Sequence, residues 1–131
     1  MTARVAYVVP GKPVGQNRSG ANGRPYGKTP AQRLFAQRLA TCGLAARRRA
    51  AWETTQRPVE VTIRVVLESE RPDTDGPVKA VLDSLEVARP KLRRPGAGFL
   101  ANDRQVRRYV VERLVDKAAP RVEVEVRELE P

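Results

Sequence analysis

The chain of 131 residues is 40% hydrophobic and 31% charged, with a formal net charge of +10, which fits one globular domain with a single core and excludes a disordered chain. It has no histidine and one cysteine, Cys42, so zinc sites, histidine general bases, Ser-His or Cys-His nucleophiles and an intramolecular disulfide are excluded. With 5% aromatic residues and no long apolar run or signal peptide, we expect a soluble cytoplasmic protein without a base-stacking platform.

The positive charge is concentrated in the N-terminal part of the chain. Residues 1–57 contain eleven Lys or Arg and one acid, a balance of 11 − 1 = +10, whereas residues 58–131 contain fourteen of each, 14 − 14 = 0. This asymmetry indicates a protein that binds a polyanion with one region and acts on it with another. Composition alone does not reject the alternative of a protein that is merely basic.

Residues 3–9 alternate apolar and polar side chains and predict a first strand. Residues 10–28 follow as a basic loop, rich in Gly, Pro and Asn and too long for a simple connector. Its cations are candidate phosphate contacts, and for each of them the alternative is a solvated surface position. With two cations of a later loop, the predicted polyanion-binding residues are Lys12, Arg18, Arg24, Lys28, Arg93 and Arg94.

A helix is predicted from Thr29-Pro30 onward, because threonine is a good N-cap and proline fits the first turn. It ends in Arg47-Arg48-Arg49, which either only cap the negative end of the helix dipole or also extend the basic surface. Cys42 is interpreted as a packing residue and not as a reactive thiol. The predicted buried stripe is Leu34, Phe35, Leu39, Cys42 and Ala46.

The clearest strand of the sequence covers residues 59–67 and leads into the acidic segment Asp73-Thr74-Asp75. In an extended chain Asp73 and Asp75 point the same way and can converge on one point. Carboxylates held together repel each other unless a cation lies between them. A set of oxygen ligands suits a hard divalent ion such as Mg²⁺. The alternative is a turn whose aspartates cap a helix and bind nothing.

A second helix is predicted over residues 75–87, with Asp75 as its N-cap and Pro77 in its first turn. Lys79 and Asp83 follow Asp75 at i+4 and i+8 and share its face. The opposite, apolar stripe consists of Val78, Val81, Leu82 and Leu85. The strand end and the helix start therefore predict two or three carboxylates and one lysine in one small volume.

Residues 89–101 are rich in Pro, Gly and Arg and are interpreted as a basic loop or arm outside the core. Asn102-Asp103 then precedes a strand over residues 104–114, and a last strand follows over residues 122–127. If the strand from residue 104 pairs antiparallel with the strand that ends near residue 68, Asp103 arrives beside the two earlier aspartates. The order β-α-β-α-β-β predicts a single α+β domain, residues 1–131, with one mixed sheet and two helices packed on it.

The pattern Asp73-x-Asp75-x-x-x-Lys79-x-x-x-Asp83-x-Leu85, followed by Asn102-Asp103-x-Gln105-Val106, resembles the motif of the RusA family of Holliday junction resolvases. The resemblance covers most of the chain, and the combination is fairly specific, although Asp-x-Asp alone is not. It implies a homodimeric endonuclease that depends on Mg²⁺, for which Mn²⁺ can substitute, and that nicks paired strands of four-way DNA junctions. By the same resemblance Asp73, Asp75 and Asp103 hold the metal, with Asp83 as a further candidate ligand, and Lys79 is needed for cleavage.

The chain departs from the family pattern at three places. Gly76 stands where asparagine is usual, Asn102 stands where an acid is common, and the segment between Asp83 and Asp103 is longer than in compact members. The first two changes either tune metal affinity or mark a weakened enzyme. Two alternatives therefore stay open beside the junction resolvase: a DNA-binding protein without catalysis, and a general Mg²⁺ nuclease acting on flaps or single strands.

Overall fold

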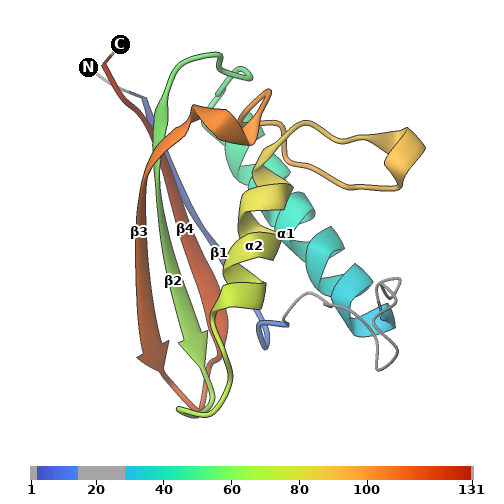
Figure 1. The fold of residues 1–131 in the computed structure, drawn as a ribbon, viewed down its shortest axis with the longest axis vertical. Coiled ribbons are helices and arrows are strands. Elements are labelled where there is room, and N and C mark those ends of the chain that lie inside the picture. Colours follow the sequence, from blue (N-terminus) through green and yellow to red (C-terminus); the bar gives the residue numbers. More distant parts are fainter. Residues whose placement is uncertain (1–2, 15–28, 131) are drawn as a thin grey trace.

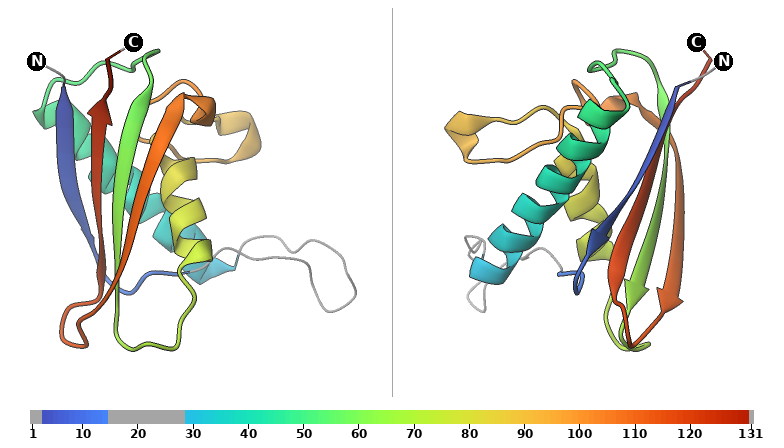
Figure 2. Two further views of the ribbon diagram at one scale, coloured as in Figure 1. Left: turned by 60° about the vertical axis from the view of Figure 1, so that its left-hand side comes forward. Right: turned by 180° about the vertical axis from the view of Figure 1, so that it is seen from behind.

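The protein is described by a computed structural model that covers residues 3–14 and 29–130. Four strands and two helices follow one another in the order β-α-β-α-β-β, interrupted by two short 3₁₀ turns. The strands form one mixed sheet, and both helices cover the same face of it, as Figure 1 and the view from behind in Figure 2 show. The predicted α+β architecture is therefore confirmed.

The sheet has the strand order β1-β4-β2-β3. Strand β4 (Arg121–Glu128) pairs antiparallel with both β1 (Arg4–Pro10) and β2 (Val59–Leu67), whereas β3 (Val106–Val115) pairs parallel with β2. The antiparallel strands bury every second side chain, as their alternating sequences predict. Strand β3 differs from them, because only its first residue, Val106, is buried.

Helix α1 (Pro30–Arg49) begins with a capping box, in which the Thr29 hydroxyl accepts from the backbone N–H of Gln32 and the Gln32 side chain accepts from the N–H of Thr29. Cys42 packs against the core as expected. Leu34, which we predicted to be buried, is 60% exposed, because position 34 lies on the side of the helix opposite its buried face. That face consists of Gln32, Phe35, Leu39, Ala40, Gly43 and Ala46.

Helix α2 (Asp75–Leu85) is shorter than predicted at its end. The backbone of Glu86 is extended (φ −74°, ψ 165°) and forms a bridge with Leu100, so the helix cannot continue to Val87. At its start Thr74 is the N-cap, and Asp75 is the first helical residue. The prediction of Asp75 as the N-cap was therefore wrong by one position.

The segment before β3 contributes to the core, although residues 89–101 were interpreted as lying wholly outside it. Phe99 is fully buried, stacks on Tyr7 at 5.8 Å between ring centroids and meets the edge of Trp52 at 5.6 Å. Only the part up to residue 93 is exposed throughout. In the part of the chain that the structure describes, neither helix combines the length and the apolar character needed to cross a membrane.

Candidate functional site

Asp73 and Asp75 lie together at the start of α2, and both are exposed. The Asp73 carboxylate accepts a hydrogen bond from the backbone N–H of Asp75 at 3.1 Å. This short turn fixes the two aspartates next to each other and supplies a partner for one of the free N–H groups of the helix start. The residue after Asp75 is Gly76, which adds no side chain beside the two aspartates.

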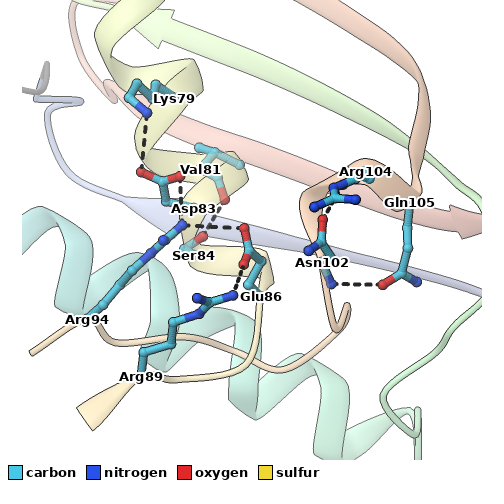
Figure 3. Close-up of polar contacts among 10 residues, drawn as sticks. All are labelled: Lys79, Val81, Asp83, Ser84, Glu86, Arg89, Arg94, Asn102, Arg104 and Gln105. Atoms are coloured by element: carbon cyan, nitrogen blue, oxygen red, sulfur yellow. Dashed lines mark hydrogen bonds and ion pairs between the residues drawn. The ribbon is translucent and has the colours of Figure 1, made fainter. Parts of the chain in front are cut away.

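Lys79 lies one helical turn farther along α2 and is exposed. Its ammonium group forms an ion pair of 3.9 Å with Asp83 at i+4. Asp83 in turn accepts from Arg94 at 2.8 Å, so two cations contact this carboxylate (Figure 3). The structure therefore ties Asp83 to the segment that follows α2.

Asp103 lies at the opposite end of α2 from Asp73. It begins the 3₁₀ turn η2 (Asp103–Gln105), which contacts the helix and leads directly into β3. Because β2 and β3 are parallel, Val106 lies beside Val59 at the start of β2, whereas Asp73 follows the end of that strand. The antiparallel pairing that we expected was therefore wrong.

The parallel pairing has a simple cause. Helix α2 carries the chain back from the end of β2 to its start, as a crossover between parallel strands must. The eleven residues of α2 span about 16 Å, and this length separates the two ends of the site. Among the described residues, no group of three or more acidic or cysteine side chains lies close enough to hold a metal ion. One chain therefore brings Asp73 and Asp75 together, and leaves Asp103 apart from them.

The turn that carries Asp103 is held by a network of side-chain amides. The side-chain oxygen Oδ1 of Asn102 accepts from the backbone N–H of Arg104 at 2.8 Å (Figure 3). The side-chain oxygen Oε1 of Gln105 accepts from the backbone N–H groups of Ala101 and Asn102, both at 2.9 Å. Asn102 thus caps the turn with its side chain.

The Gln105 amide also links this turn to the chain before β2. Its NH₂ group donates to the carbonyl oxygens of Thr55 at 2.8 Å and Arg57 at 2.9 Å. Both donors and both acceptor positions of this side chain are therefore used. Sequence reasoning treated Gln105 only as part of a motif, whereas the structure makes it the residue that holds the Asp103 turn in place.

The predicted polyanion-binding cations fall into three groups. Arg18, Arg24 and Lys28 lie outside the described residues. Lys12 is exposed and forms an ion pair of 2.7 Å with Glu68, and Arg93 is exposed. Arg94 bonds to Asp83 and Glu86, so its guanidinium is engaged within the protein.

The arginines at the end of α1 divide in the same way. Arg47 donates to the carbonyl oxygens of Ala97 and Trp52, both at 2.8 Å, and therefore has a structural role. Arg48 and Arg49 are exposed and remain candidates for a basic surface.

Strand β3 presents an unexpected apolar surface at the edge of the sheet. One of its edges pairs with β2, and no strand among residues 3–14 and 29–130 pairs with the other. Five large apolar side chains along it are between 38% and 52% exposed: Tyr109, Val110, Val111, Leu114 and Val115. The sequence signal was the runs of consecutive apolar residues at 109–111 and 114–115, where a strand with one solvated face would alternate.

A comparison with known proteins identifies the family. The family model described as Endodeoxyribonuclease RusA matches residues 10–127, nearly the whole chain. Among curated proteins, no sequence matches the chain. The matched region contains every motif residue described above, from Asp73 to Val106. The chain belongs to the RusA endodeoxyribonuclease family.

Proposed function

We propose that the protein is a Mg²⁺-dependent endonuclease that resolves four-way DNA junctions by paired nicks, and that it acts as a homodimer. The observation that carries the proposal is the separation of the acidic residues: Asp73 and Asp75 lie at one end of α2 and Asp103 at the other. The edge strand β3 connects these two ends and is uncovered. A second copy of the chain paired with β3 would cover the open edge and bring the separated aspartates of the two subunits closer together.

The surface of β3 favours a partner of its own kind. A ten-residue edge strand with exposed apolar side chains invites pairing with another strand and aggregates unless something covers it. Tyr109, Val111 and Val115 are in register with the buried residues of β2, so they point toward the helix layer beyond the edge of α2. Pairing of two β3 strands would satisfy the open backbone edge and bring these side chains into cross-strand contact with those of the other subunit.

Twofold symmetry determines how the two strands would run. Two identical edge strands joined about an axis perpendicular to the sheet are antiparallel, so the start of each lies beside the end of the other. Val115, at the end of β3, lies beside Leu67, and the chain reaches Asp73 six residues later. Asp103 lies three residues before the start of β3. Each subunit would therefore bring Asp103 toward the aspartate pair of its partner.

The residues fit a magnesium ion. Asp73 and Asp75 supply exposed carboxylate oxygens from a fixed turn, and Asp103 of the other subunit would add a third. When bound, Mg²⁺ supplies Lewis-acid polarisation of the phosphodiester and acidifies water. The carboxylates hold the ion, and the three of them repel one another less when it is present. Two such sites related by a dyad would address two symmetry-related strands of a junction.

Lys79 would act on the substrate side of this site. Its ammonium group is exposed one turn from Asp75, and its ion pair with Asp83 of 3.9 Å is long. An exposed pair of this kind contributes only a few tenths of a kcal/mol to the helix. The lysine can therefore turn toward a phosphate and offset the negative charge that develops during cleavage.

Mixing two inactive variants tests the shared site. Asp73→Asn and Asp103→Asn each inactivate both sites of their own homodimer. A mixed dimer would contain one site with both substitutions and one site with neither. After subunit exchange in a 1:1 mixture, half of the dimers would be mixed, so nicking of a synthetic four-way junction in Mg²⁺ should return to about a quarter of the wild-type level. The products would be single nicks without paired resolution, visible on a denaturing gel.

The outcomes separate the candidate functions. A mixture that stays inactive although its subunits exchange would contradict the shared site. Wild-type protein that binds a junction but never cuts it in Mg²⁺ or Mn²⁺ would be the DNA-binding protein without catalysis, an alternative favoured by the incomplete site of one chain. Equal cleavage of junction, fork, duplex and single strand would identify a general nuclease.

A further inference from the structure

Residues 87–96 form an arm that projects from the end of α2, away from the sheet (Figures 1 and 2). The arm begins after Glu86 and ends where Ala97 returns to the core. Residues 87–93 are exposed throughout. The acidic motif does not account for this segment.

The base of the arm consists of two strands of backbone in close contact. Arg89 and Arg94 exchange two backbone hydrogen bonds of 2.9 and 3.1 Å. Gly96 lies so close to the other side of the arm that a Cβ there would collide with the carbonyl oxygen of Glu86 and the backbone N of Ala88. Ala97 donates to the carbonyl oxygen of Ser84 at 2.7 Å. These contacts make the arm a defined structure and not a loose loop.

A buried carboxylate joins the arm to α2. The Glu86 side chain is 6% exposed and bonds to Arg89 at 3.3 Å and Arg94 at 3.4 Å (Figure 3). Arg94 also bonds to Asp83 at 2.8 Å, with side chains 28% and 27% exposed. Because a buried charge without partners is costly, these pairs favour one orientation of the arm relative to the helix.

The tip combines one apolar side chain with two cations. Leu92 is 66% exposed, the highest exposed fraction among the large hydrophobic residues described. Lys91 and Arg93, on either side of it, are also exposed. Arg93 has the left-handed φ of 52° that closes the turn, with its N–H donating to the carbonyl oxygen of Pro90 at 2.9 Å. Glycine would adopt this φ at about 1 kcal/mol less cost, so the arginine side chain at this position calls for a function.

We propose that the arm is a DNA wedge: Leu92 inserts between bases at the branch of a junction, while Lys91 and Arg93 contact the flanking phosphates. Proteins that bend DNA often insert one leucine or similar side chain between base pairs and hold the neighbouring backbone with cations. The partner follows from this chemistry, because an apolar tip between two cations suits stacked bases between two phosphates. A rigid base is needed, since a wedge must transmit force to the stack. The inference rests on the proposed function for its substrate.

The position of the arm agrees with this role. It leaves α2 at the end that contacts η2, which carries Asp103. Backbone hydrogen bonds connect the start of the arm to the segment before η2. The N–H of Leu100 donates to the carbonyl oxygen of Leu85, and the N–H of Val87 donates to that of Leu100, both at 3.1 Å. A wedge attached here would set the branch point of the DNA at a fixed offset from that aspartate.

The test uses a four-way junction with 2-aminopurine beside the branch, in buffer without divalent metal so that nothing is cut. Wild-type protein should raise the fluorescence severalfold as the base unstacks. Leu92→Ala should remove most of this rise and weaken junction binding roughly tenfold while leaving linear duplex binding unchanged. Leu92→Phe should restore the rise. Leu34→Ala, which truncates a leucine with 60% exposure on α1, should behave as wild type.

Two further variants separate the wedge from charge. Lys91→Gln and Arg93→Gly should each lower the slope of log affinity against log salt by about one per arm in contact, with the fluorescence rise retained at low salt. A Leu92→Ala protein with the full wild-type rise would overturn the inference, as would weaker binding to junction and duplex alike. If wild-type protein does not bind the junction at all, the proposed function fails first. Wild-type cleavage by Leu92→Ala together with the full rise would leave the proposed function intact and remove only the wedge.

Discussion

The aspartates near the two ends of α2 belong to one motif, but they are held in place by different kinds of contact. At the start of the helix, Asp73 and Asp75 are neighbours in sequence and are held by one local turn. At the other end, Asp103 depends on the long-range bonds of Gln105 to the carbonyl oxygens of Thr55 and Arg57. A local turn is favoured by its own residues, whereas the long-range bonds of Gln105 form only when the chain before β2 lies beside the turn. The first end is thus determined by spacing and the second by topology.

The largest expected effect comes from the local end. Asp75→Asn preserves the shape of the turn, since the backbone N–H that donates to Asp73 remains. It removes one carboxylate charge, so cleavage of a four-way junction should fall by more than about two orders of magnitude. Junction binding should persist or tighten, because a negative charge near DNA has gone. Single-turnover cleavage and an electrophoretic binding assay measure the two effects, and an Asp75→Asn protein that cuts like wild type would remove this aspartate from the site.

Asp103→Asn should lose as much cleavage as Asp75→Asn, which would make the two ends equivalent in function. It should be neutral or stabilising in the absence of metal, because repulsion between carboxylates is relieved. Thermal melts with and without Mg²⁺ check this, since the variant should lose the stabilisation that wild type gains from the ion. A variant that still gains the full stabilisation would place Asp103 outside the metal site.

The next effect addresses the strand that joins the two ends. Val111→Lys introduces a charge at the centre of the uncovered edge of β3, where the native side chain is 44% exposed. If the dimer forms there, the variant should be monomeric by light scattering at micromolar concentration and should lose cleavage with it. Val8→Lys is the matched control, because Val8 is 51% exposed on β1, the opposite edge of the sheet. Dimers of the Val111 variant that remain active would exclude pairing through β3.

Much of this arrangement could be predicted from the sequence. Alternation gave the strands β1, β2 and β4, and cap residues placed the start of α1 within one residue. Asp75, Lys79 and Asp83 share one face of α2, as the helical spacing predicts. Asp73 and Asp75 are neighbours through a turn and not through the extended segment that we expected, because Thr74 has helical backbone angles (φ −98°, ψ −16°). The direction of β3 relative to β2 could not be predicted from the sequence. Parallel and antiparallel strands have similar sequences, and the choice depends on where α2 returns the chain.

Two smaller errors have the same origin. The buried face of α1 uses Gln32 and Gly43, which no scale of hydrophobicity selects, in place of Leu34. Gly43 is buried because Tyr7 and Ala97 approach it so closely that a Cβ would lie 2.8 Å from the Ala97 side chain. Likewise Ala97, Phe99 and Leu100 occur in a segment of loop composition but lie in the core. Tertiary contacts decided each of these positions.

A moderate effect is expected at the turn that carries Asp103, because long-range bonds hold it in place. Gln105→Glu keeps the size of the side chain but replaces the NH₂ group that donates to Thr55 and Arg57. Two carbonyl oxygens would then face a carboxylate, so the free energy of unfolding should fall by about 1–3 kcal/mol. Gln56→Glu, on an exposed neighbour, controls for the added charge. Chemical denaturation measures the loss. If cleavage at saturating substrate falls with it while junction affinity holds, the turn positions Asp103, and unchanged cleavage would make its role purely structural.

The smallest effect concerns the ion pairs that fasten the start of β3 beside the Asp103 turn. Glu60, with a side chain 14% exposed, bonds to Arg108 on β3 and to Arg127 on β4, both at 3.1 Å. Burial alone would raise the pKa of Glu60, but the hydrogen bonds and charges of these two arginines outweigh it and hold the pKa below its usual value of 4.5. The charged form is therefore favoured in the folded protein, and its stabilisation is complete only above pH 4.5.

That stabilisation is lost as the pH falls through the lowered pKa of Glu60. Glu60→Gln should therefore be less stable than wild type at neutral pH, by under about 1 kcal/mol because water screens both pairs, with the Arg108 side chain 66% and the Arg127 side chain 37% exposed. The two proteins should converge as the pH is lowered below 4.5. Melting temperatures measured between neutral pH and the acid range test this. A difference that persists unchanged into acid would mean that Glu60 contributes through packing, and that charge does not hold the start of β3 in its register.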